Sequence, residues 1–281
     1  MNISIFHKDF HLLAESPFWS DFHSELFWVD IMRSSLHRMS LKNEHRQYEL
    51  PEAFTSIIVS KNIVLGITAN GFCSFDLECE RFERLMDVEA DKPGNRSNDG
   101  AADNHGGYVF GTMHQEGNLR TGSIYHVDTV AMRLQVLDSD YYIPNGFAFI
   151  NEYRQLLIAD SYLGHIYVYD YDPVSIRLTN KQMFSDISKT GFSPDGMCVT
   201  SDNKIWNAEW DGGRLTQYDA SGNVEQRISL PVPRPTSCVL DTTESRLYVT
   251  SARVDMTASQ IEKYPDSGSV MSVELSHGLS D

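Results

Sequence analysis

Four short segments of the chain carry side-chain oxygen atoms next to proline or glycine, in a pattern that suits ligand binding. They are AESPFW from Ala14, NRSNDG from Asn95, IPNGFAF from Ile143 and SPDGMCV from Ser193. The residues of interest in them are Glu15, Asn98, Asn145 and Asp195, with Arg96 and Asp99 close by. Carboxylate and amide oxygens together form a hard, negatively charged environment that suits a divalent cation completed by water. The sequence shows no histidines or cysteines at the spacing of a dedicated zinc site.

Turn formation is the competing interpretation of each segment taken alone. SPDG and PNG are common turn sequences, because proline fixes φ while asparagine, aspartate and glycine tolerate turn conformations. NDG likewise initiates hairpins. Only placement of the segments at comparable points of different structural units favours a shared site over a set of turns.

The elements that must position these residues repeat along the chain. Each copy is an apolar strand, a small polar break and a second alternating strand, and the copies start roughly 35 to 50 residues apart, the range of a propeller blade. The six copies begin at Leu26, Ile63, Tyr108, Leu156, Lys204 and Arg246. Alternation with period two and enrichment in aromatic and β-branched residues predict strands rather than helices.

Radial packing of such sheets buries both of their apolar faces, so we predict an all-β fold, a six-bladed β-propeller. We expect residues 1–281 to form a single domain, with ISIFHK near the N-terminus adding a strand to the last blade and closing the ring. A β-sandwich pair or two small β domains are the alternative. In a propeller the innermost strands line the central channel, so the four polar segments would converge at one of its mouths.

Composition excludes several classes of partner. The formal net charge of −16 and the lack of clustered Lys and Arg argue against binding to nucleic acid or an anionic membrane surface. The acidity suits cation binding, although solubility is the commoner reason for it. The N-terminus lacks a signal-peptide pattern and no stretch is apolar enough to span a bilayer, so we expect a cytoplasmic protein.

Several segments, taken in order, resemble the SMP-30/gluconolactonase/LRE family, which includes regucalcin and bacterial sugar lactonases. The similar segments are AESPFW, NRSNDGAADNHGGYVFGTM, TGSIYHVD, IPNGFAF, GFSPDGMCV and RPTSCVL with LYVTSA. The resemblance covers nearly the whole chain and implies a six-bladed propeller that binds one divalent metal ion and hydrolyses aldonolactones. The metal ligands that it implies are Glu15, Asn145 and Asp195. It places Asn98 beside the metal and Arg96 against the sugar.

The chain departs from the family in two places. INEYRQ replaces a second SPDG-like turn after IPNGFAF, which we expect to change only an outer loop. The segment after GTM is short, and it makes Glu116 a candidate for contact with the sugar. Tyr141, Tyr142, Trp206, Trp210 and Phe18 are candidates for an apolar wall, although such aromatic residues more often pack in a core.

Metal-assisted hydrolysis fits a chain that lacks the GxSxG nucleophile motif. A divalent ion would polarise the lactone carbonyl and activate water, and Asp195 would be a ligand and also the general base. The alternative is that Asp195 is only a ligand. The expected activity is that of a carboxylic ester hydrolase acting on glucono-, galactono- or xylonolactone.

Two other functions remain open at this point: a divalent-cation-binding regulatory scaffold and a phosphotriesterase-like hydrolase. The sequence also leaves open the choice among Ca, Zn, Mg, Mn and Fe(II), the sugar and the ring size of the lactone, and the oligomeric state.

Overall fold

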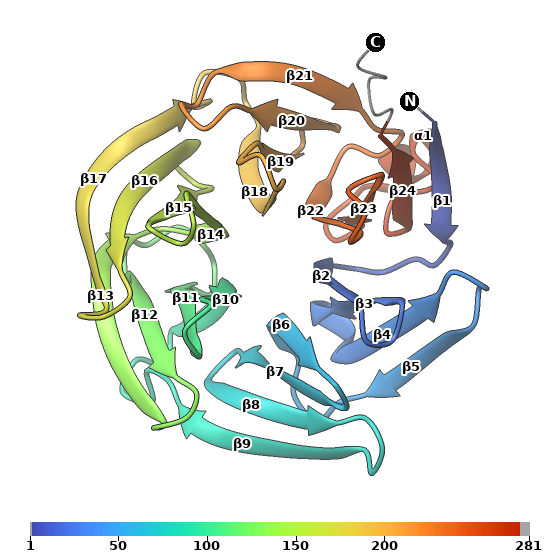
Figure 1. Ribbon diagram of the computed structural model, residues 1–281. Helices are drawn as coiled ribbons and strands as arrows, with labels where there is room; N and C mark the ends of the chain where they lie inside the picture. Colours follow the sequence, from blue (N-terminus) through green and yellow to red (C-terminus); the bar gives the residue numbers. More distant parts are fainter. Residues whose placement is uncertain (1, 276–281) are drawn as a thin grey trace.

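The protein forms six four-stranded antiparallel sheets arranged around a central axis, as seen in the computed structural model (Figure 1). The structure describes residues 2–275. The six-bladed β-propeller predicted from the repeats is confirmed, and the alternative of a sandwich or two small β domains is wrong. No helix within residues 2–275 is long and apolar enough to cross a bilayer.

Five blades follow the chain from the axis outward, each with its first strand innermost. Blade 1 consists of β2 (Ala14–Ser20), β3 (Glu25–Asp30), β4 (Ser35–Ser40) and β5 (His45–Glu49). Blade 2 consists of β6 (Phe54–Ser60), β7 (Ile63–Thr68), β8 (Gly71–Asp76) and β9 (Arg81–Asp87). Blade 3 consists of β10 (Asn95–Ala102), β11 (Gly107–His114), β12 (Gly122–Asp128) and β13 (Arg133–Tyr141). Blade 4 consists of β14 (Pro144–Ile150), β15 (Gln155–Asp160), β16 (His165–Asp172) and β17 (Arg177–Asp186). Blade 5 consists of β18 (Ser193–Val199), β19 (Ile205–Trp210), β20 (Arg214–Tyr218) and β21 (Val224–Ser229).

Blade 6 combines the two ends of the described chain. It consists of β22 (Pro235–Leu240), β23 (Arg246–Ser251), β24 (Val270–Glu274) and β1 (Ile3–His7). β1 is its outermost strand and pairs antiparallel with β24, with Ile3 opposite Val273. This pairing joins the first strand of the chain to the last blade and closes the ring.

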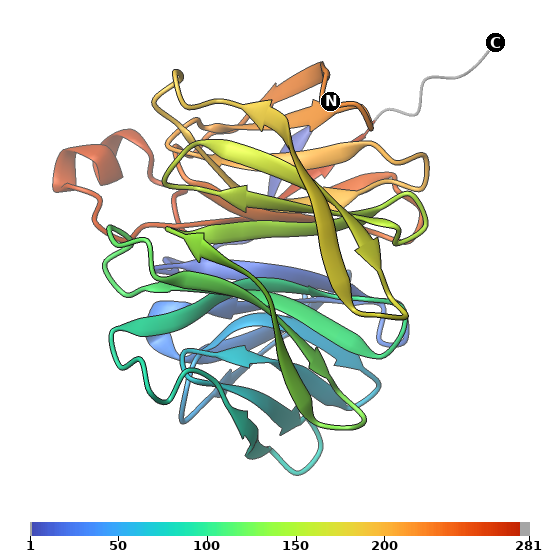
Figure 2. The ribbon, with the colours of Figure 1, turned by 90° about the vertical axis from the view of Figure 1, so that its left-hand side faces the viewer.

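Two short helices interrupt the strands. The 3₁₀ helix η1 (Ile31–Arg33) follows β3, and α1 (Ala258–Lys263) lies in the connection between β23 and β24. A capping box starts α1: the Thr257 hydroxyl accepts from the backbone N–H of Gln260, and the Gln260 side chain accepts from that of Thr257. Figure 2 shows α1 projecting beyond the strands on one side of the disc.

Apolar side chains between neighbouring blades form the core. Strands β3 and β15 are almost fully buried on both faces, since each sheet packs against two neighbours. The largest completely buried side chains include Trp28, Trp206 and Tyr108. Removing this apolar surface from water is the main force that holds the blades together and fixes the innermost strands around the axis.

Candidate active site

A cavity of about 550 Å³ lies where the first halves of the innermost strands meet. Its lining comes from blades 1, 3, 4, 5 and 6. The cavity brings together the polar residues that the sequence predicted for the site, namely Glu15, Arg96, Asn98, Glu116, Asn145 and Asp195, and also Asp99. Its volume lies in the range usual for small-molecule sites.

A repeated irregularity in the innermost strands explains this convergence. Each of these strands loses register with its neighbour within its first half, and the breaks fall after Glu15 in β2, Ser97 in β10, Asn145 in β14 and Pro194 in β18. Residues in such a bulge leave the regular ladder, which redirects their side chains. The polar segments are therefore bulged strands rather than separate turns between blades.

Glycine at position 146 allows the strands of blades 4 and 5 to approach closely. Its φ is +55°, a conformation that costs glycine little. A Cβ atom there would lie 2.4 Å from the backbone oxygen of Asp195, inside any permitted contact. The backbone N–H of Gly146 donates to Asp99 Oδ2 at 2.9 Å and to Asn145 Oδ1 at 3.0 Å. The PNG sequence thus positions side chains from both β10 and β14.

Direct hydrogen bonds connect the polar side chains of three blades. Asn145 Nδ2 donates to Asp195 Oδ1 at 2.5 Å. Arg96 Nη1 donates to Asn98 Oδ1 at 3.1 Å, and Asn98 Nδ2 donates to the backbone oxygen of Pro144 at 3.1 Å. The Asn98 amide is therefore held at its oxygen by Arg96 and at its nitrogen by Pro144, and the guanidinium of Arg96 is oriented by Asn98. Glu116 is exposed at the edge of the cavity.

The buried acids of the cavity have unusual protonation equilibria. Burial, together with repulsion from Asp195 and Asp99, raises the pKa of Glu15 well above its usual value. Burial and the nearby charge of Asp99 do the same to the pKa of Asp195, and burial raises the pKa of Asp99 to about 6. Burial lowers the pKa of Arg96, although Glu15 opposes this effect. These are the signs of like charges enclosed together without enough positive charge.

The donor set fits a hard divalent cation. Five carboxylates line the cavity, from Glu15, Asp99, Glu116, Asp195 and Asp255, against the single guanidinium of Arg96. Glu15, Asn145 and Asp195 supply carboxylate and amide oxygens from three blades, a combination that Ca²⁺ and similar ions favour. A doubly charged cation would compensate the repulsion that raises the pKa values of these acids.

One aromatic residue of the five proposed from the sequence lines the cavity. Trp210 is at the wall, whereas Tyr141 and Trp206 are completely buried in the core. Tyr162, which the sequence analysis did not select, also lines the cavity, and its ring stacks on Tyr142 at 4.3 Å. A period-two pattern does not distinguish aromatic residues at a blade interface from those at a strand end.

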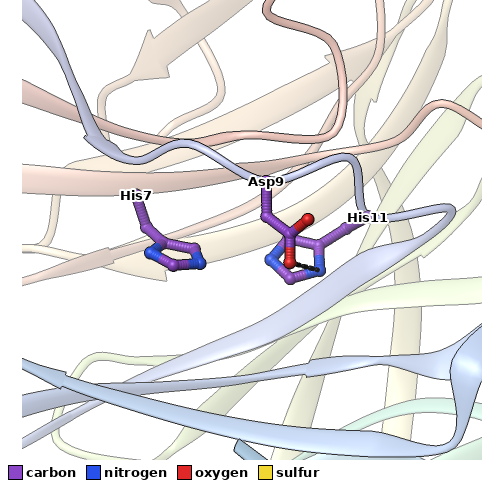
Figure 3. A group of neighbouring side chains, drawn as sticks. All are labelled: His7, Asp9 and His11. Carbon is purple, nitrogen blue, oxygen red and sulfur yellow. Dashed lines mark ion pairs between the residues drawn. The ribbon is translucent and has the colours of Figure 1, made fainter. Parts of the chain in front are cut away.

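A second group of chemically active side chains lies at the closure of the ring, and the sequence analysis missed it. His7, Asp9 and His11 alternate along an extended segment, so they share one side of it (Figure 3). Their ligand atoms lie within 4.8 Å of one another, which is a group able to hold a metal ion. The expectation of no histidines at ligand spacing was therefore wrong: HKDFH carries this spacing once its backbone is extended.

Blade 1 adds His37 from β4 and His45 from β5 to this group. We call His7, His11, His37 and His45 the histidine seam. His37 Nδ1 and His45 Nε2 are 3.1 Å apart, and the rings of His7 and His45 lie 4.2 Å apart. Trp28 Nε1 donates to His11 Nε2 at 3.1 Å, which leaves the His11 proton on Nδ1. That proton opposes metal binding through Nδ1, the His11 atom nearest Asp9.

Comparison with known proteins agrees with the fold and identifies the family. Residues 13–253 match the profile of the SMP-30/gluconolactonase/LRE-like region. An L-arabinolactonase from Azospirillum brasilense is 30% identical over 94% of this chain and 89% of its own length, and regucalcin from Xenopus laevis is 29% identical over 93% and 90%. The crystal structure of a calcium-binding protein, regucalcin, from Agrobacterium tumefaciens has a TM-score of 0.91 at 26% identity, covering 96% of this chain and 92% of that one.

Proposed function

Because the chain belongs to the SMP-30/gluconolactonase/LRE-like family, we propose that it hydrolyses sugar lactones to aldonic acids with the help of one divalent metal ion. The similarity to an L-arabinolactonase supports a lactone-hydrolysing enzyme of the carboxylic ester hydrolase class. The observation that carries the proposal is the group of oxygen donors from three blades on the floor of a substrate-sized cavity.

Glu15, Asn145 and Asp195 would hold the ion. When bound, a divalent cation supplies Lewis acidity, which polarises a carbonyl oxygen and lowers the pKa of water. The side chains of the cavity would orient the reacting groups, accept the proton and bind the substrate. The hydrogen bond from Asn145 fixes Asp195 Oδ1, so the direction of the Asp195 carboxylate is set before substrate arrives.

Asp195 is our candidate for the general base. Its carboxylate lines the cavity and is otherwise enclosed, so a water molecule between it and the lactone carbonyl would lie within hydrogen-bond reach. The proton of that water would pass to a carboxylate oxygen of Asp195 as the new C–O bond forms, and it would be returned to the ring oxygen as the ring C–O bond breaks. Asp99 is the second candidate for this proton, since it also lines the cavity.

Arg96, Asn98 and Glu116 would bind the substrate. The Arg96 guanidinium is a planar donor array suited to ring oxygens and to the carboxylate released on ring opening. Asn98 is held by Arg96 and Pro144, and therefore presents its amide in one orientation. Glu116, exposed at the cavity edge, would accept from a sugar hydroxyl group.

A cation-binding role without catalysis is the second candidate, because a similar structure is that of a calcium-binding protein. The guanidinium of Arg96 favours the enzyme. A site that only stores cations gains nothing from a positive side chain held beside its carboxylates.

The test is a panel of five- and six-membered aldonolactones offered to metal-stripped protein, with Ca, Zn, Mg, Mn and Fe(II) restored one at a time. Spontaneous hydrolysis is subtracted, and an activated phosphotriester serves as the comparison substrate. We expect turnover of at least one aldonolactone that is lost on stripping and recovered with an ion. Tight ion binding without turnover of any lactone would identify a cation-binding scaffold, and turnover unaffected by stripping would refute the role of the metal.

A further inference from the structure

Arg234 connects two parts of the cavity wall that come from different blades. It lies in the segment that leads into β22, and its side chain is only 14% exposed. Its Nε donates to Asp211 Oδ1 at 2.7 Å, and its Nη1 donates to the backbone oxygen of Val254 at 2.5 Å. Its guanidinium carbon also lies 4.9 Å from the centre of the Trp210 ring. One side chain thus makes a cation–π contact and two charge-assisted hydrogen bonds.

Each partner of Arg234 either lines the cavity or is next in the sequence to a residue that lines it. Trp210 ends β19 in blade 5 and lines the cavity, and Asp211 follows it. Val254 and Asp255 follow β23 in blade 6 and also line the cavity. The backbone of the same segment adds two bonds, since Pro233 accepts from Gly213 and Arg234 accepts from Ala252. The guanidinium therefore fixes the distance between the loop after β19 and the loop after β23. The backbone hydrogen bonds already hold both loops to the segment of Arg234.

This wall differs in character from the one that faces it. Blade 3 contributes Arg96, Asn98 and Glu116, which are polar, whereas blade 5 contributes Trp210 and blade 6 contributes Val254, both apolar, beside the exposed Asp255. Blade 6 is opposite blade 3 in a ring of six (Figure 1). A sugar derivative has hydroxyl groups that need polar partners and C–H faces that pack well on an aromatic ring. The polar residues of blade 3 suit the hydroxyl groups of the sugar, and Trp210 with Val254 suits its C–H face.

We propose that Arg234 is a positioning residue for substrate, and this proposal rests on the lactone hydrolase function. By holding Trp210 and the loop at Val254, it sets the apolar wall against which the carbon chain of an aldonolactone packs. Arg234 itself is not among the residues that line the cavity. Its effect therefore falls on KM rather than on kcat, and on lactones with a hydroxyalkyl substituent rather than on the bare ring.

The test uses Arg234→Met, which keeps an unbranched apolar stem but removes the guanidinium, and Arg234→Lys, which keeps the charge without the planar fork. Arg46→Met is the matched control, because Arg46 also pairs with a carboxylate, Glu80 at 2.6 Å, and covers an aromatic ring, Tyr48 at 4.7 Å, but lies on an outer strand. The substrates are the aldonolactone preferred by the wild type and the unsubstituted lactone of the same ring size, γ-butyrolactone or δ-valerolactone.

For the aldonolactone we expect Arg234→Met to raise KM about tenfold with kcat within about twofold of wild type, and Arg234→Lys to recover part of the loss. For the unsubstituted lactone KM should change less than about twofold. Arg46→Met should leave all values unchanged. An equal rise in KM for both lactones, or a loss confined to kcat, would overturn the proposal.

Amide hydrogen exchange of residues 210–213 and 252–257 separates this proposal from the function on which it rests. Exchange there should quicken in Arg234→Met and not in Arg46→Met, whether or not the protein acts on lactones. Unchanged exchange would refute the structural role of Arg234. Absence of lactone turnover by the wild type would instead refute the proposed function, and with it the assignment of the wall to a sugar.

Discussion

The cavity on the axis and the histidine seam both enclose titratable side chains, yet they do so with opposite consequences. In the cavity, burial and mutual repulsion raise the pKa values of Glu15 and Asp195. In the seam, burial and neighbouring imidazoles lower the pKa of His7 to about 4 and also lower the pKa values of His37 and His45. Each environment disfavours the charged form of its groups.

The two regions differ in how far the uncharged form is satisfied by the protein itself. In the seam, Trp28 donates to His11 Nε2 and Ser35 bonds to His37, but within residues 2–275 His11 Nδ1 and His7 Nε2 have no hydrogen-bond partner. In the cavity, the carboxylates of Glu15, Asp99 and Asp195 lie around one half-buried arginine, Arg96. The seam thus holds partly paired neutral groups, whereas the cavity holds unbalanced negative charge that a cation would relieve.

Substitution of Asp195 should give the largest effect and bears directly on this contrast. Asp195→Asn removes the carboxylate needed for the metal ion or for the proton, and we expect lactone turnover to fall by about 10³-fold or more. The same change relieves repulsion in the cavity, so the metal-free protein should gain about 1 kcal/mol in the free energy of unfolding. Steady-state kinetics and denaturant unfolding measure these two quantities, and ion titration measures the affinity for the metal ion.

Asp255→Asn is the control for this change, because Asp255 lines the same cavity but is exposed. It should alter turnover and stability far less. If Asp195→Asn keeps its affinity for the ion while losing activity, the result supports the general-base role. A destabilised metal-free variant would contradict our account of the cavity.

In the histidine seam, removal of a hydrogen-bond donor by Trp28→Phe should lower the stability of the protein. Trp28→Phe removes the donor to His11 and leaves a buried acceptor without a partner, and we expect a loss of about 3 kcal/mol in the free energy of unfolding. Trp206→Phe is a matched control, since Trp206 is equally buried but its Nε1 has no hydrogen-bond partner among residues 2–275. Denaturant unfolding of both should show Trp28→Phe to be the more costly, and equal losses would refute the importance of this bond.

The smallest expected effect concerns the pH dependence of stability. The pKa of His7 is about 4 in the folded protein and 6.5 in the unfolded chain, so the unfolded chain binds more protons between these values. Its contribution to stability is complete above pH 6.5 and is lost as the pH falls towards 4. Since His7 is only half-buried and partly screened by solvent, we expect about 1 kcal/mol of loss between pH 7 and pH 5.

His7→Gln should remove this part of the pH dependence, which unfolding experiments at pH 7 and pH 5 can measure. His105→Gln, in a turn of blade 3, serves as the control and should retain the slope of the wild type. A slope that is the same in all three proteins would mean that His7 is already accessible to protons in the folded state.

The fold could be predicted because its cause is local and repeated. Alternating segments such as HIYVYDY define strands, and six copies require an arrangement that covers both faces of every sheet. The strand ISIFHK could also be recognised by its alternation. Register breaks are different, because a bulge depends on the pairing partner, and nothing in NRSNDGAA by itself separates a bulged strand from a turn.

The site could be predicted only as far as its residues form recognisable segments. Asn145 and Asp195 stand in PNG and PDG, and the structure places both in the cavity. Arg234 stands in an unremarkable VPRPT segment, and its partners Asp211 and Val254 belong to other loops. Contacts of this kind depend on how blades are placed relative to each other, which a single sequence does not encode in any short pattern.

The pairing of β1 with β24 determines the order in which this protein can be completed. Ile3 in β1 precedes every other strand of the described chain, whereas its partner Val273 in β24 follows them all. During synthesis β1 therefore has no neighbour, and the edge of the growing sheet array stays open to other chains. Since the lining of the cavity includes residues of blades 1 and 6, the complete cavity should form only when this final pairing forms.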